Sequence, residues 1–340
     1  MREMDKKACI LGSGAWAGAL AIILSDNGFD VTLWARNSHT REFFSEARML
    51  PKLPGVCLPD TVNITGCADE GLSQASLVVS AIPSSAVSSV ANSLAMYIPP
   101  YAFLVSATKG FDYTSLKRPS QVWVEANPEL RLRTCVLSGP NFAKEIAGRL
   151  PAATVVAGED ESARLTVQKQ FMTPYFRVYS HDDVVGVEVG GALKNVIALA
   201  CGMVEGMELG DNARAAIISR GLAEMVRLGV SMGAEPLTFS GLSGLGDLVL
   251  TSTGKLSRNR QAGVAVGRGQ SITEFIEKTG YTVEGFQTVR AARDLSLVHQ
   301  VRMPITDVVY RILYEGMPVS DGVSEIMNRE AKPESEPFFR

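Results

Sequence analysis

The strongest constraint on the fold is the segment Gly12–Ala17, which reads GSGAWA and follows a short apolar run at residues 7–11. Gly12, Gly14 and Ala17 give the spacing G-x-G-x-x-A, and residues 15–27 form an apolar stretch of helical length. In a strand–turn–helix unit, the first glycine permits the tight turn, the second lets the backbone approach a pyrophosphate, and the small third residue lets helix and strand pack closely. The segment therefore predicts a Rossmann-type dinucleotide site.

The next predicted strand, residues 30–35, bears on which dinucleotide is bound. An NAD-selective site usually has an acidic residue near the end of this strand to bind the ribose 2′-hydroxyl, whereas an arginine accommodates a 2′-phosphate. No Asp or Glu occurs between Val31 and Thr40, and Arg36 directly follows the strand. The sequence thus predicts NADPH or NADH as cofactor, with NADP favoured.

The rest of the chain predicts two domains. Further strands are expected at 76–82, 102–106, 134–138, 152–157 and 176–179, with a helix at 84–97. Apolar helical patterns follow at 182–203, 211–230, 257–266, 271–278, 284–299 and 305–314. We expect an α/β Rossmann domain with a mostly parallel sheet over 1–180, an all-α domain over 181–330, and a flexible tail over 331–340. Arg220 and Glu224 are expected to pair one helical turn apart.

Composition excludes several partners. The 33 basic and 36 acidic residues give a net charge of −3, which offers no basic surface for nucleic acid or an anionic membrane. No apolar stretch of the length of a membrane span is expected. The five cysteines include no C-x-x-C pair, which indicates buried, reduced thiols and a cytoplasmic protein. No metal site is predicted, and a homodimer is compatible with the sequence.

Lys194 is the predicted acid–base residue. The three histidines, His39, His181 and His299, lie in contexts that favour structural roles. Lys194 lies in an apolar helix, with Gly190, Gly191, Ile197 and Ala198 one turn away, so no neighbour on that helix can pair with its ammonium. Desolvation would favour the neutral amine and allow proton exchange near neutral pH. The two glycines are expected to leave space for a ligand. The alternative is a lysine whose stem is buried at the helix edge while its amine reaches water.

Four loops carry further candidate residues. Ser106–Gly110 and Ser138–Ala143 follow strands, where parallel sheets place ligand contacts. Gly241–Asp247 is a glycine-rich loop that leads to a carboxylate. Ser257–Arg260 begins a helix, and its N–H groups and Arg258 suit a phosphate or carboxylate. Each loop, taken alone, fits turn chemistry as well as function.

Together these segments closely resemble the bacterial-type NAD(P)-dependent glycerol-3-phosphate dehydrogenases. The ordered motifs are GSGAWAGALA, LWAR, ATKG, SGPNFAKE, VGGALKNVIA, NARAAIISRGLAEM, GLSGLGDLVLT, SRNR and VEGF, which span nearly the whole chain. The resemblance implies reversible reduction of dihydroxyacetone phosphate to sn-glycerol 3-phosphate for glycerophospholipid synthesis. It also implies a C-terminal domain like that of 6-phosphogluconate dehydrogenase, with catalysis in the cleft between the two domains. Two departures from the family pattern are Ala17-Gly18, where many relatives have Gly-Thr, and Asn141, where Ser or Thr is frequent.

The resemblance also implies roles for individual residues. Lys194 would donate the proton to the carbonyl oxygen in reduction and accept it in the reverse direction. The implied substrate ligands are Lys109, Gly139, Asn141, Lys194, Asp247, Ser257, Arg258 and Asn259. The implied cofactor contacts are Gly12, Gly14, Ala15, Trp16, Arg36, Lys109, Ala143, Arg258, Thr282 and Glu284.

Two alternatives remain open from the sequence. Other two-domain hydroxyacid-type dehydrogenases, such as 6-phosphogluconate or ketopantoate enzymes, also use a lysine on a helix. A non-catalytic NADP-binding sensor would share the glycine-rich turn, but it would not need a lysine beside two glycines and an anion-binding helix.

Overall fold

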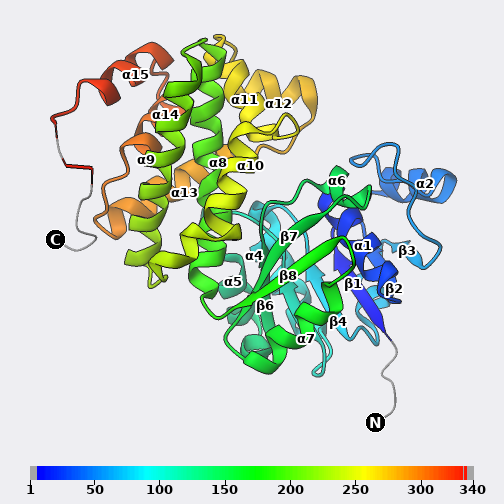
Figure 1. The fold of residues 1–340 in the computed structure, drawn as a ribbon. Helices are drawn as coiled ribbons and strands as arrows, with labels where there is room; N and C mark the ends of the chain where they lie inside the picture. Colours follow the sequence, from blue (N-terminus) through cyan, green and yellow to red (C-terminus); the bar gives the residue numbers. More distant parts are fainter. Residues whose placement is uncertain (1–5, 332, 335–340) are drawn as a thin grey trace. The chain divides into compact units, whose positions relative to one another are not determined.

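The computed structural model describes residues 6–331, 333 and 334, and the chain divides into two compact units (Figure 1). Unit 1 comprises Met1–Lys109 and Lys117–Val184, and unit 2 comprises Gly110–Leu116 and Val185–Arg340. Most of the tail predicted at 331–340 lies outside the described residues.

Unit 1 is built on one eight-stranded sheet. Its strands are β1 (Lys7–Leu11), β2 (Asp30–Trp34), β3 (Val62–Thr65), β4 (Leu77–Ser80), β5 (Phe103–Ser106), β6 (Thr134–Ser138), β7 (Ala152–Gly158) and β8 (Phe176–His181). They lie in the order β3-β2-β1-β4-β5-β6-β7-β8, which contains the Rossmann order 3-2-1-4-5-6. Every predicted strand is present, and all neighbours pair in parallel except β6 and β7, which are antiparallel. The predicted mostly parallel Rossmann sheet is confirmed.

Helices cover both faces of this sheet. They are α1 (Ala15–Asp26), α2 (Ser38–Ala47), α3 (Ala68–Leu72), α4 (Val87–Leu94), α5 (Pro119–Ala126), α6 (Ala143–Ala147) and α7 (Glu161–Phe171). Side chains of α1, α6 and α7 pack in one apolar core with alternate residues of the strands, and those of α4 and α5 pack in a second core on the other face. The helix predicted at 84–97 is shorter than expected, because α4 is flanked by 3₁₀ turns at Ser84–Ala86 and Ala95–Tyr97.

Unit 2 is helical, as predicted. Its helices are α8 (Val184–Gly206), α9 (Gly210–Ser231), α10 (Asp247–Thr253), α11 (Arg258–Gly267), α12 (Ile272–Thr279), α13 (Glu284–Val298), α14 (Pro304–Tyr314) and α15 (Val319–Met327). The two longest, α8 and α9, run side by side, with Gly221 against Ile197 (Figure 1). Neither α10 nor α15 was predicted from the sequence.

Helix α8 corrects the expectation about membrane spans. It is 23 residues long, with a mean hydropathy of 1.6 over its most apolar window, so it passes the length and composition test for a membrane-crossing helix. However, 89% of that window is buried. The core helix of a folded domain passes the same test, and we assign α8 to that class.

Two other expectations are wrong in part. The partners of the Glu224 carboxylate on α9 come from α14 and not from Arg220. The carboxylate accepts the backbone N–H groups of Ile305 and Thr306 at 2.6 and 3.1 Å. This tertiary contact with the first turn of α14 outweighs the weak pairing along one helix. The cysteines are all free, but Cys57 and Cys67 are exposed, since they lie in irregular segments of unit 1 and not in apolar strands or helices.

Candidate functional site

The turn between β1 and α1 has the geometry expected of a pyrophosphate cradle. Gly12 has φ +128°, and a Cβ there would lie 2.7 Å from the carbonyl oxygen of Ala81, so only glycine fits. A Cβ on Gly14 would meet no atom within 4 Å, so the space beside it is open. Helix α1 has neither a side-chain cap nor an acidic residue in its first turn. Ala15 and Trp16 begin that helix, whose N-terminus suits an anion.

Two arginines, Arg36 and Arg41, lie just after the end of β2. Arg36 is exposed, with its guanidinium 5.9 Å from the centre of the Trp34 ring. Arg41, which sequence reasoning missed, donates to the carbonyl oxygens of Ala35 and Arg36 at 2.8 and 2.9 Å. A second arginine therefore fixes the loop that carries Arg36. Its signal in the sequence was a basic residue shortly after the strand, without an intervening acid.

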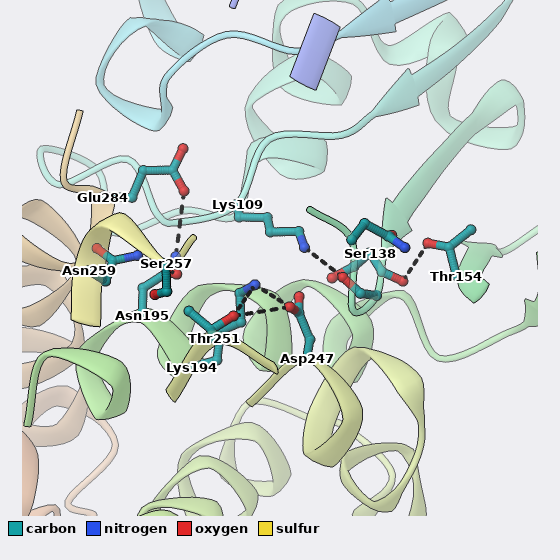
Figure 2. Close-up of polar contacts among 12 residues, drawn as sticks. Lys109, Ser138, Thr154, Lys194, Asn195, Asp247, Thr251, Ser257, Asn259 and Glu284 are labelled. Atoms are coloured by element: carbon teal, nitrogen blue, oxygen red, sulfur yellow. Dashed lines mark hydrogen bonds and ion pairs between the residues drawn. The ribbon is translucent and has the colours of Figure 1, made fainter. Parts of the chain in front are cut away.

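A second group of unit 1 forms where β5 and β6 end. Lys109 donates to the carbonyl oxygen of Gly139 at 3.0 Å (Figure 2). A Cβ on Gly139 would lie 2.8 Å from the Cα of Thr154, so the loop packs closely on β7. Asn141 donates to the carbonyl oxygen of Ala153 at 2.9 Å, and its buried Oδ1 has no hydrogen-bond partner. The structure thus brings Lys109, Gly139 and Asn141 together, and Ala143 begins α6 directly after them.

Lys194, in unit 2, lies at the centre of a buried polar cluster. Its Nζ donates to Oδ1 of Asp247 and, at 2.9 Å, to the hydroxyl of Thr251, which itself donates to the same Asp247 oxygen at 3.2 Å (Figure 2). The side chains of Lys194 and Asp247 are 8% and 0% exposed. The expectation of a lysine with no charged neighbour is therefore wrong, because it considered only residues on the same helix.

Gly190, one turn before Lys194 on α8, explains how Asp247 reaches the lysine. A Cβ on Gly190 would lie 2.7 Å from the carbonyl oxygen of Ser243, so the π-helical turn Leu242–Gly246 packs directly on α8. Asp247 is the first residue of α10, immediately after that turn. The space predicted for a ligand at Gly190 is thus filled by the protein backbone. Irregular π-helical turns of this kind are frequent at functional sites.

A second polar network of unit 2 starts from Asn195, which sequence reasoning also missed. Asn259 donates to its Oδ1 at 2.8 Å and accepts the N–H of Gly285 at 2.9 Å. Asn195 in turn donates to Glu284 at 3.5 Å (Figure 2). These contacts join α8, α11 and the first turn of α13, and Thr282 lies in the loop just before that turn. The signal available in the sequence for Asn195 was an amide residue directly after Lys194 in an otherwise apolar stretch.

The start of α11 carries the remaining candidates. Ser257 caps the helix by accepting the N–H of Arg260 at 3.2 Å, and Arg258, its first residue, is exposed. The first turn contains no acidic residue. An exposed guanidinium beside a helix N-terminus suits an anionic group.

One histidine has the structural role expected of it. His181 accepts the N–H of Asp183 at 2.9 Å through Nδ1, directly before α8.

Comparison with known proteins places these features in one family. The family model described as NAD-dependent glycerol-3-phosphate dehydrogenase matches with its N-terminal part at residues 7–164 and with its C-terminal part at residues 183–324. The chain is 45% identical to a Moorella thermoacetica protein named glycerol-3-phosphate dehydrogenase (NAD(P)+), over 98% of this chain and 99% of that protein. It is also 45% identical to a Streptomyces griseus protein of the same name, over 96% and 98%. The crystal structure of a Coxiella burnetii glycerol-3-phosphate dehydrogenase superposes with a TM-score of 0.91 at 34% identity, covering 96% of this chain and all of that one.

Proposed function

Because the chain belongs to the NAD-dependent glycerol-3-phosphate dehydrogenase family, we propose that Lys194 is the acid–base group of an NAD(P)-dependent enzyme that interconverts dihydroxyacetone phosphate and sn-glycerol 3-phosphate. The observation that carries this proposal is the buried contact of the Lys194 ammonium with Asp247 and Thr251. The cysteines, none of which is in a disulfide, support a reducing compartment, and we assign the enzyme to the cytoplasm.

The residues of unit 1 fit a dinucleotide. Gly12 and Gly14 leave the backbone of the β1–α1 turn accessible, and the uncapped N-terminus of α1 offers N–H groups to the pyrophosphate. The indole Nε1 of Trp16 is buried and has no hydrogen-bond partner, which fits a bound group beside the turn. Arg36, held by Arg41, would bind the 2′-phosphate of NADP. When bound, the reduced nicotinamide supplies the hydride.

The chain's own part in the reaction is to supply and recover one proton. Asp247 and Thr251 accept hydrogen bonds from Nζ of Lys194, and in reduction Nζ donates a proton to the substrate oxygen as negative charge develops there. In the oxidative direction the neutral amine accepts the hydroxyl proton. Thr251 contacts both charged groups and fixes the direction in which Nζ points.

Substrate recognition requires anion-binding groups apart from this lysine. Arg258 and the N-terminus of α11 would bind the phosphate, with Ser257 as the helix cap and Asn259 beside it. Lys109, Gly139 and Asn141 of unit 1 would supply further substrate contacts.

A steady-state assay tests the proposal. Oxidation of NADPH and of NADH is followed with dihydroxyacetone phosphate and with ketopantoate, and in the reverse direction reduction of NADP+ and of NAD+ is followed with sn-glycerol 3-phosphate and 6-phosphogluconate. We expect turnover only with the triose phosphate pair. Turnover of ketopantoate or 6-phosphogluconate alone would assign a different dehydrogenase, and cofactor binding without any turnover would favour a sensor.

A further inference from the structure

We propose that Arg260 is a positioning residue, which sets the phosphate-binding end of α11 against the helix that carries Lys194. The inference rests on the proposed function, since it concerns the phosphate site of that reaction. The two arginines of the SRNR segment thus have different roles. Arg258 is exposed and is a proposed phosphate ligand, whereas the side chain of Arg260 is only 15% exposed and binds another helix of the protein.

The first contact is an ion pair of fixed geometry. Arg260 donates through Nε and Nη2 to the two carboxylate oxygens of Glu205 on α8, at 2.8 and 2.5 Å. The backbone N–H of the same residue donates to the capping hydroxyl of Ser257. A two-point arginine–carboxylate contact fixes orientation as well as distance. Arg260 therefore joins the first turn of α11 to the end of α8.

The second contact is backbone against backbone. A Cβ on Gly202 of α8 would lie 2.2 Å from the carbonyl oxygen of Arg260, and a Cβ on Gly263 of α11 would lie 2.2 Å from that of Leu199. One turn further along, a Cβ on Gly206 would lie 2.4 Å from the carbonyl oxygen of Val264, and a Cβ on Gly267 would lie 2.2 Å from that of Met203. Without side chains between the helices, a shift of α11 cannot be absorbed by a change of rotamer.

These contacts lie on the same helix as the proposed acid–base group. Lys194 precedes Gly202 by about two turns of α8, roughly 12 Å of helix. The Asn259–Asn195 hydrogen bond ties α11 to α8 beside the lysine, and the Arg260–Glu205 pair ties it further along. With both ties in place, the distance from the start of α11 to Lys194 is fixed before substrate arrives. Preorganisation of this kind contributes to rate, because a displacement of about 1 Å can cost on the order of 100-fold.

The test compares a phosphorylated with a non-phosphorylated substrate. Arg260→Gln removes the two-point contact, and we expect kcat/KM for dihydroxyacetone phosphate to fall about 10- to 100-fold. For dihydroxyacetone, which lacks the phosphate, kcat/KM should stay within about twofold, because Lys194 and its partners are untouched. Arg214→Gln is the matched control, since Arg214 on α9 pairs with Asp211 and lies 3.9 Å from the same Glu205 carboxylate. It should leave both substrates unaffected. The double variant Arg260→Glu with Glu205→Arg should recover part of the loss by restoring the pair.

An equal loss for both substrates, or no loss for either, would overturn the positioning role. If Arg260→Gln fails to fold, Gly263→Ala gives the second measurement, with Gly322→Ala as the control for a steric clash elsewhere in unit 2. The same selective loss is expected for Gly263→Ala alone, and an equal loss in both glycine variants contradicts the proposal. The parent's turnover of dihydroxyacetone phosphate tests the proposed function, whereas the ratio of variant to parent tests the role of Arg260.

Discussion

Lys194 and Asp247 illustrate how a buried charge is retained at a site of proposed chemistry. Each side chain is removed from water and each is the other's charged partner. Removing one member of a buried pair leaves an uncompensated charge, which typically costs about 3–5 kcal/mol. Substitution at either position is therefore expected to change stability and turnover together, and the two effects must be measured separately.

Lys194→Met is expected to lower kcat by about 10²- to 10⁴-fold, the usual contribution of general acid catalysis. Affinity for NADPH should be unchanged, because the proposed cofactor contacts of Lys109, Arg36 and the glycine turn remain. Steady-state kinetics and NADPH fluorescence titration measure the two quantities, and thermal unfolding records the cost of the unpaired carboxylate. Lys255→Met, on an exposed loop, is the control. Retention of most of the parent's kcat would remove Lys194 from the mechanism.

Arg36→Asp tests cofactor choice. An aspartate at the end of β2 binds the ribose 2′-hydroxyl and repels a 2′-phosphate. We expect the ratio of kcat/KM for NADPH to that for NADH to fall by about 10-fold or more, equivalent to the loss of one charge-assisted contact. Arg177→Asp, on β8 and also exposed, is the control for a change of charge. An unchanged ratio would mean that Arg36 does not contact the cofactor.

At the scale of the element, the π-helical turn Leu242–Gly246 is what brings the carboxylate to the lysine. Gly190→Ala would place a methyl group 2.7 Å from the carbonyl oxygen of Ser243, and the turn would have to move, carrying Asp247 with it. We expect kcat to fall about 10- to 100-fold, with a loss of stability of roughly 1–3 kcal/mol from overpacking. Kinetics and chemical denaturation check this. Gly322→Ala, which meets side chains of α14, should lose stability but keep its kcat.

Elements with strong apolar patterns were predictable, and those fixed by tertiary contact were not. The run β1–α1–β2 was found because its side chains are buried on both faces of the sheet. The sequence predicts a glycine-rich loop at Gly241–Asp247, since GLSGLG has the composition of a turn, whereas the structure has a π-helical turn at Leu242–Gly246 that packs on Gly190 of α8. The composition of β7 also does not indicate that this strand pairs antiparallel with β6.

The same limit applies to the site. Lys194 and Asp247 were each identified from the sequence, but not as a pair, because 53 residues separate them and no local pattern reports the contact. Arg260 could not be distinguished from Arg258 for the same reason, since the partner of Arg260 lies on another helix.

At the scale of the whole molecule, the two units contain buried or paired carboxyl groups whose pKa values shift in opposite directions. In unit 1, the hydrogen bonds from Arg149 hold the pKa of Asp26 below its usual value of 3.8. In unit 2, burial raises the pKa of Glu224 above its usual 4.5. The hydrogen bonds from the N–H groups of Ile305 and Thr306 lower this pKa, but their effect is smaller than that of burial. The two groups should therefore control different parts of the pH–stability profile.

For Asp26, the folded pKa is lowered, so the unfolded chain binds more protons below pH 3.8 and stability is lost as the pH falls through the folded pKa. Asp26→Asn should flatten this acid limb and leave the profile above pH 5 parallel to the parent's.

For Glu224, the folded pKa is raised, so the contribution of this group to stability is fully present below pH 4.5 and is lost as the pH rises through the folded pKa. Each unit of that shift is worth about 1.4 kcal/mol. Glu224→Gln removes the ionisation but keeps an oxygen that can accept the N–H groups of α14, so the variant should gain on the parent as the pH rises from 4.5 toward neutrality. Urea denaturation at a series of pH values, taken as the difference between each variant and the parent, measures both effects. A Glu224→Gln difference that does not change with pH would show that burial does not dominate the titration of this carboxyl group.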